Sequence, residues 1–203
     1  MTLASTPAGR IQRHKLVDRA YHWLMAACVL ILLVTAFLPI LGLKFEWVGI
    51  HWVTGLVLAV IVLFHIIRAS FFQNFWAMMI DGTDLKAPFA KPGKYDLAQK
   101  LYHLAISILI LSVIATGLLM WRKVDTPFWQ RDPYWLSTES WGVVYAIHGL
   151  AAMALVTMVI IHVYFALRPD EWHLTRSMLR GWITRKEYQD HHDPRRWQAK
   201  DEA

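Results

Sequence analysis

Cysteine is almost absent from this sequence, with Cys28 the single example among 203 residues. A disulfide framework, a cysteine-ligated iron–sulfur cluster and a covalently attached c-type haem all need more cysteines than one. If the chain holds a redox centre, imidazole side chains must therefore hold it.

Acidic residues are missing from the interiors of four long apolar runs, and 56% of all residues are apolar. A soluble domain of this length would not carry several unbroken apolar runs of about 20 residues. We therefore expect an all-α fold, a bundle of four transmembrane helices. The first run follows a basic segment as in a signal peptide, but it is too long for such a peptide and is expected to remain as a span. The expected spans are about 17–40, 50–72, 98–121 and 141–167.

The net charge of +6 is unevenly distributed along the chain. Counted with the adjoining span ends, seventeen of the twenty-one Lys and Arg residues precede span one, separate spans two and three, or follow span four. The positive-inside rule then places both termini in the cytoplasm, and nucleic-acid binding is not expected. The prediction is a polar N-terminal arm (1–16), a membrane domain (17–167) and a basic amphipathic cytoplasmic tail (168–203), in a bacterial inner membrane.

Two of the apolar runs each carry a pair of histidines fourteen residues apart, His51 with His65 and His148 with His162. Fourteen residues are close to four helical turns, so each pair shares one face and is separated by roughly 21 Å along the axis. Ionisable residues inside a span are costly and mark functional sites. This pattern predicts two b-type haems, each with two axial histidines. A histidine-lined metal-ion transporter is the alternative, although it would usually add carboxylates inside the spans.

Topology sorts these histidines by membrane face. His51 and His148 each lie just after the outer start of a helix that runs inward, so they are expected to hold the outer haem together. For the inner haem, His162 is one ligand. The residues alone leave the second ligand open between His22, His65 and His103.

Several motifs in this chain resemble those of a known family. They are, in order, Asp18-Arg-Ala-Tyr-His-Trp23, His51-x3-Gly55, Gly93-Lys-Tyr-Asp-x-x-Gln-Lys100 and His148-x13-His162. From about residue 10 to the basic tail, the sequence resembles the gamma (cytochrome b) subunit of the membrane-bound, nitrate-inducible formate dehydrogenases. It is more loosely similar to the cytochrome b subunits of nickel–iron hydrogenases and thiosulfate reductases.

The resemblance implies axial ligands for both haems. His22 would pair with His162 on the cytoplasmic side and His51 with His148 on the periplasmic side, with His65 as the alternative ligand to the inner haem. It also implies an iron–sulfur beta subunit and a molybdenum- or tungsten-pterin alpha subunit as partners. The chain would pass electrons from the periplasmic iron–sulfur partner to a membrane quinone, either menaquinone or ubiquinone. A hydrogenase, a thiosulfate reductase or another pterin oxidoreductase would need the same membrane subunit.

A quinone site is implied at the start of the third span. The segment Gly93–Lys100 resembles the quinone-site loop of the family, which makes Asp96, Gln99 and His103 the candidate quinone contacts. The asparagine typical of the family is Asp96 in this chain. The alternative interpretation is a helix N-cap, because Asp followed by Gln three residues later is a capping box.

Overall fold

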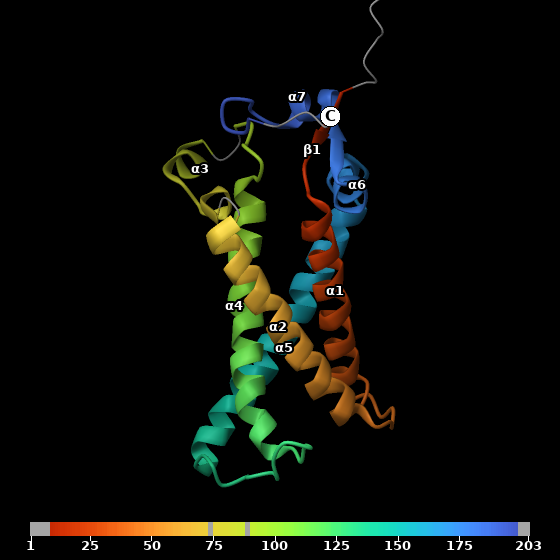
Figure 1. Ribbon diagram of the computed structural model, residues 1–203, viewed down its shortest axis with the longest axis vertical. Coiled ribbons are helices and arrows are strands. Elements are labelled where there is room, and N and C mark those ends of the chain that lie inside the picture. The colour runs from red at the N-terminus through yellow and green to blue at the C-terminus, as the bar shows by residue number, and fades with distance from the viewer. Residues whose placement is uncertain (1–8, 73–74, 88–89, 199–203) are drawn as a thin grey trace, which may run out of the picture. The chain divides into compact units, whose positions relative to one another are not determined.

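Four long helices make up most of the chain in the computed structural model, which describes residues 9–72, 75–87 and 90–198 (Figure 1). All four are long and apolar enough to cross a membrane, so the predicted all-α fold with four transmembrane helices is confirmed. Their bounds are α1 Leu16–Phe37, α2 Trp47–Phe72, α4 Leu97–Met120 and α5 Thr138–Leu167.

Shorter elements connect the long helices and follow them. The 3-10 helices are η1 Phe75–Met78, η2 Trp121–Lys123 and η3 Pro169–Glu171, and the short α-helices are α3 Gly82–Lys86, α6 Trp172–Arg180 and α7 Arg185–His191. Two three-residue strands, β1 Arg10–Gln12 and β2 Trp182–Thr184, pair antiparallel with Ile11 opposite Ile183. This ribbon was not predicted, and it places part of the expected N-terminal arm in regular structure.

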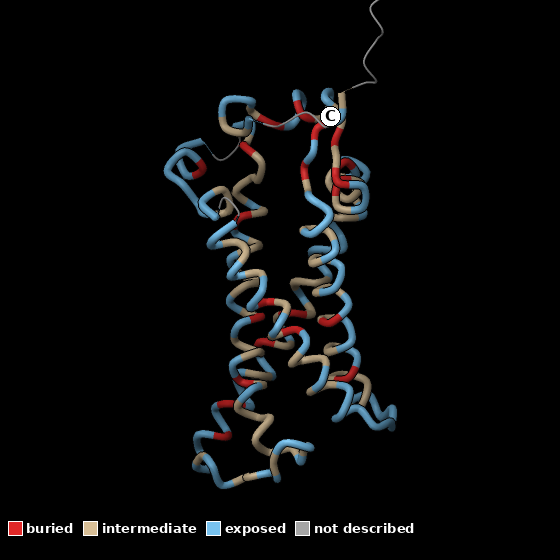
Figure 2. Tube along the Cα trace, in the orientation of Figure 1, coloured by how far each residue is buried: buried red, intermediate tan, exposed pale blue. Residues whose placement is uncertain are grey.

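The chain divides into two compact units. One comprises residues 23–68 and 105–160, and its core is formed by side chains that face one another across all four long helices. The buried members of this core are Cys28, Leu58, Val62, Ile110 and Leu155. Elsewhere the long helices expose large apolar side chains such as Val60, Leu150 and Ile160. Figure 2 shows that buried positions are sparse along these helices. Such an apolar surface suits the hydrocarbon core of a lipid bilayer.

The second unit comprises residues 1–22, 69–104 and 161–203, as far as they are described. Its core is small and is built on the β1–β2 ribbon, with Ile11, Ile183 and Tyr188 buried and Trp197 packed against them. Helix α6 is capped at its C-terminal end by Gly181, whose φ of 97° is a left-handed conformation that favours glycine. The Gly181 carbonyl accepts hydrogen bonds from the backbone N–H groups of Arg13 and His14, which ties the chain ahead of α1 to the tail.

Candidate haem sites

The first pair of imidazoles comes from α2 and α5. His51 lies near the start of α2 and His148 in the first half of α5. Their ring centroids are 6.4 Å apart and their planes are inclined at 66°. Both side chains are half-buried and both belong to the unit with the four-helix core. The structure therefore brings together the two histidines that topology assigns to one haem.

The second pair comes from α1 and α5. The ring centroids of His22 and His162 are 6.1 Å apart, with an interplanar angle of 48°. Tyr102 of α4 stacks on His162 at 5.4 Å and 24°. These three residues belong to the unit that contains the β1–β2 ribbon. The structure thus brings His22 next to His162, the arrangement that the family resemblance implies.

Both ring separations fit a metal ion held between two imidazoles. A metal–imidazole bond is about 2.0–2.1 Å long and the ring centroid lies about 1 Å farther, so two opposed ligands place their centroids about 6 Å apart. The observed values are 6.4 Å and 6.1 Å. Imidazole also suits iron, and a porphyrin supplies the remaining four ligands. The residues present therefore fit two haems with bis-histidine ligation.

Two threonines support the His51–His148 pair. The Thr35 hydroxyl lies 2.8 Å from Nδ1 of His51, and the Thr116 hydroxyl lies 2.8 Å from Nδ1 of His148. Thr35 is only 3% exposed and Thr116 only 7%. Beside Thr116, Gly117 presents no side chain, and a Cβ there would lie 3.5 Å from Cε1 of His148. One hydroxyl from α1 and one from α4 therefore contact the imidazoles of α2 and α5.

The other two candidate histidines are His65 and His103. His65 is half-buried on α2. His103 is half-buried on α4, one residue after the Tyr102 that stacks on His162. His65 as a haem ligand and His103 as a quinone contact stay predictions.

Asp96 and Gln99 form the capping box that the sequence offers as the alternative to a quinone site. Oδ1 of Asp96 accepts the Gln99 backbone N–H at 2.7 Å, and Oε1 of Gln99 accepts the Asp96 backbone N–H at 3.3 Å. This reciprocal pair satisfies two backbone donors at the start of α4. Both side chains are therefore engaged in holding the helix end, and any quinone contact would be additional to that role.

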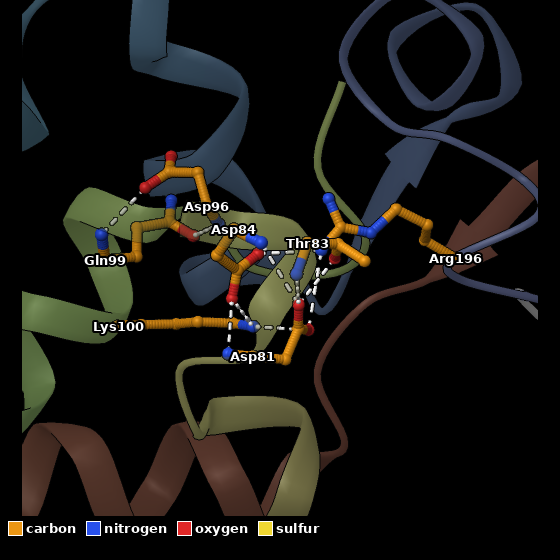
Figure 3. Close-up of polar contacts among 7 residues, drawn as sticks. All are labelled: Asp81, Thr83, Asp84, Asp96, Gln99, Lys100 and Arg196. Atoms are coloured by element: carbon orange, nitrogen blue, oxygen red, sulfur yellow. Dashed lines mark hydrogen bonds and ion pairs between the residues drawn. The ribbon is translucent and has the colours of Figure 1, made fainter. Parts of the chain in front are cut away.

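A charged cluster lies beside this helix start, as Figure 3 shows. Lys100 Nζ is 2.6 Å from Asp84 and 3.5 Å from Asp81, and Arg196 Nη2 is 2.7 Å from Asp84 and 3.5 Å from Asp81. Lys100 and Asp84 are buried. Burial alone raises the pKa of Asp84, but hydrogen bonds from Lys100, the Asp81 backbone and Arg196 outweigh it and lower the pKa overall. The cluster links α3, α4 and the tail through balanced charges.

The loop before α4 is held by two buried side chains from opposite ends of the chain. Nη2 of Arg13 donates to the Lys94 carbonyl at 2.7 Å, and Nδ1 of His192 contacts the Gly93 carbonyl at 2.7 Å. Nη1 of Arg13 also lies 2.7 Å from Nε2 of His192. Burial, aided by the Arg13 charge, lowers the pKa of His192 to about 4. His192 is therefore neutral at neutral pH.

Sequence reasoning missed these supporting residues. Thr35 and Thr116 each lie about five residues before the outer end of a predicted span, close to the depth expected for His51 and His148. That coincidence of depth is a signal that could have identified them. Arg13 and His192 carry no comparable signal, because 179 residues separate them.

Four membrane-crossing helices with paired imidazoles define a membrane cytochrome that binds b-type haem. The chain belongs to the prokaryotic cytochrome b561 family, whose model matches residues 13–181. It is a multi-pass bacterial membrane protein with an electron-transfer role.

Several relatives are formate dehydrogenase subunits, so the predicted resemblance is confirmed. The chain is 25% identical to the formate dehydrogenase cytochrome b556 subunit of Haemophilus influenzae, over 93% of this chain and 82% of that protein. It is also 25% identical to the cytochrome b556(fdo) subunit of Escherichia coli K12, over 92% of this chain and 91% of that protein. A third relative is the nitrate-inducible cytochrome b556(Fdn) subunit of the same strain, again 25% identical, with 92% and 89% covered.

Proposed function

We propose that this chain is the di-haem membrane subunit of a formate dehydrogenase complex. It passes electrons between a periplasmic iron–sulfur subunit, which serves a molybdenum- or tungsten-pterin catalytic subunit, and a membrane quinone. The observation that carries the proposal is the spacing of the two imidazole pairs, 6.1 Å and 6.4 Å between ring centroids. The formate dehydrogenase subunits among its relatives favour this complex over a hydrogenase or thiosulfate reductase.

The proposed ligands are His22 with His162 for one haem and His51 with His148 for the other. Haem held by these histidines would supply one-electron exchange, and ligation by two imidazoles would leave no open position for O₂. The chain holds the four imidazoles on three helices inside an apolar bundle. Low dielectric around these positions and hydrogen bonds to the ligands would tune the redox potentials.

The start of α4 is the proposed quinone site. Tyr102 stacks on His162 at 5.4 Å, so this part of α4 lies next to one imidazole pair. Gln99 and His103 are four residues apart and share one face of α4, and Asp96 directly precedes this helix. Asp96 could exchange a proton with a quinone oxygen, whereas the capping contacts with Gln99 would hold its carboxylate at the helix end.

The aromatic loop between η2 and α5 is the proposed docking surface for the iron–sulfur subunit. Phe128 is 75% exposed and Tyr134 is 91% exposed. Behind them, Trp129 packs on Trp121, and Trp121 stacks on Trp52, the residue next to His51. Aromatic residues are enriched in protein interfaces, and Trp129 connects this loop, through Trp121 and Trp52, to the part of α2 that carries His51.

Haem content per polypeptide tests the proposal, with His22→Ala and His65→Ala as matched variants of the purified chain. We expect two haems in the parent by pyridine haemochrome, one in His22→Ala and two in His65→Ala, because the His22 ring lies 6.1 Å from the His162 ring. A quinol analogue should also reduce the haem iron of the parent, which is followed by the change in haem absorbance.

Two results would contradict this assignment. A parent chain that folds without haem would rule out the cytochrome function. A haem lost in His65→Ala but kept in His22→Ala would move the second ligand of His162 from α1 to α2.

A further inference from the structure

The hydrogen positions around the His51–His148 pair follow from the contacts of Thr35 and Thr116. Each threonine hydroxyl has one hydrogen and donates it back along its own helix. Oγ1 of Thr35 lies 2.8 Å from the Ile31 carbonyl, and Oγ1 of Thr116 lies 2.6 Å from the Ser112 carbonyl. This back-bonding is the usual arrangement for a threonine inside a helix.

Because the hydroxyl hydrogen is committed, only the oxygen lone pairs remain for the imidazoles. Nδ1 of His51 and Nδ1 of His148 must then carry the proton and donate to the threonines, each at 2.8 Å. A neutral imidazole has a single ring proton. Nε2 of each ring is therefore left with a free lone pair, which is what iron ligation requires.

We propose that Thr35 and Thr116 are positioning residues that fix the tautomer and orientation of His51 and His148 and lower the redox potential of the haem they hold. The inference rests on the proposed function, since it takes these histidines as axial ligands. It goes beyond that function by assigning electronic tuning to two hydroxyls on the remaining two helices, α1 and α4.

The direction of the tuning follows from the acceptor. A hydrogen bond from the distal ring nitrogen to an acceptor makes the ligating nitrogen more basic. A more basic ligand stabilises ferric over ferrous iron and lowers the potential. A hydroxyl does this without the free-energy cost of a carboxylate inside an apolar span. Both hydroxyls are nearly excluded from solvent, with Thr35 3% and Thr116 7% exposed, so water does not replace them.

Redox titration of the haem absorbance tests the proposal, with Thr35→Val and Thr116→Val in the full chain. Valine keeps the shape of threonine and removes the hydroxyl acceptor. His148 also has a backbone hydrogen bond with Val113 that Thr116→Val leaves in place, so Thr35→Val is the cleaner test. We expect the potential of one haem to rise, with its reduced-to-oxidised ratio at a fixed potential up by about tenfold, which is about 59 mV for a one-electron couple. The affected wave should be the one that disappears in His51→Ala, and the other wave should stay in place.

Serine variants at the same two positions serve as controls because they restore the hydroxyl. Thr35→Ser and Thr116→Ser should titrate close to the parent. If a valine variant loses its haem, retention of that haem in the serine variant supports the hydroxyl role, and its loss in serine as well overturns it.

Two further outcomes distinguish the inference from the proposed function. Valine variants that keep two haems with unchanged potentials overturn the inference and leave the function intact. A parent chain without haem, or a His51→Ala variant that retains both haems, overturns the ligand assignment and the inference together.

Discussion

At the scale of single residues, His192 links both ends of the chain to the loop before α4. Its Nδ1–H donates to the Gly93 carbonyl and its Nε2 accepts from Arg13, both at 2.7 Å. Only the neutral imidazole can do both, because a protonated ring would direct a second N–H at the guanidinium. Stacked His173 and His191 add to the positive field that opposes protonation.

We predict that acid releases the tail from this loop. The pKa of His192 is lowered from 6.5 to about 4 by burial and by Arg13, so the unfolded chain binds the proton more readily than the folded one. The stabilising contribution is complete above about pH 6.5, falls by about 1.4 kcal/mol per pH unit below it, and stops falling near pH 4. Hydrogen exchange of residues 182–197, corrected for the intrinsic effect of pH, should show this loss.

The control is His192→Gln, whose amide can donate to Gly93 and accept from Arg13 without titrating. Because burial also lowers the pKa values of His14 and His173, the variant should keep part of the pH dependence. Equal acid sensitivity in parent and variant would show that His192 does not control the tail.

The proposed haem ligands were easier to identify from sequence than the residues that contact them. An imidazole inside an apolar run stands out, and the spacing of His51, His65, His148 and His162 pointed to haem from sequence alone. A threonine in a span does not stand out, because it can satisfy its hydroxyl on its own helix. Which imidazole Thr35 meets depends on helix packing, and local sequence does not contain that information.

At the scale of elements, the long helices were predicted within a few residues and the short ones were not. The first helix ends at Phe37 rather than at residue 40, because Pro39 disfavours helical geometry in the residue before it and lacks a backbone N–H. The β1–β2 ribbon escaped prediction because each strand has three residues and its partner is more than 160 positions away. Its register is set by burial of Ile11 against Ile183.

The junction of α3 with α4 should depend on the buried ion pair between Asp84 and Lys100. We predict that Asp84→Asn destabilises the solubilised protein by roughly 3–5 kcal/mol, since it removes the nearer carboxylate from the buried Lys100 charge and leaves the more exposed Asp81 at 3.5 Å. Thermal unfolding measures this effect. Asp81→Asn is the matched control: Asp81 is 52% exposed, asparagine still caps a helix, and the cost should be below about 1 kcal/mol.

A double variant separates charge from packing in this pair. Asp84→Leu with Lys100→Met removes both charges and keeps apolar volume, so it should recover much of the lost stability. An Asp84→Asn variant as stable as the Asp81→Asn control would show that the pair does not hold the junction.

At the scale of the whole molecule, charge should determine how the four helices cross the membrane. The loop between α1 and α2 carries Lys44 as its only basic residue, whereas eight basic residues follow α5. The positive-inside rule counts such short segments next to span ends. This asymmetry predicts that both termini, and the loop between α2 and α4, lie in the cytoplasm.

Alkaline phosphatase fusions test this topology, because the enzyme is active only after export. We predict high activity for fusions after Lys44 and Gln130, and low activity after Gly82 and Ala203. Fusions to green fluorescent protein should give the inverse pattern. The result also decides which imidazole pair lies nearer which side of the membrane. With the predicted topology the His51–His148 pair lies nearer the periplasm, where a periplasmic iron–sulfur subunit would dock. The reversed pattern would place the His51–His148 pair nearer the cytoplasm and contradict the proposed direction of electron transfer.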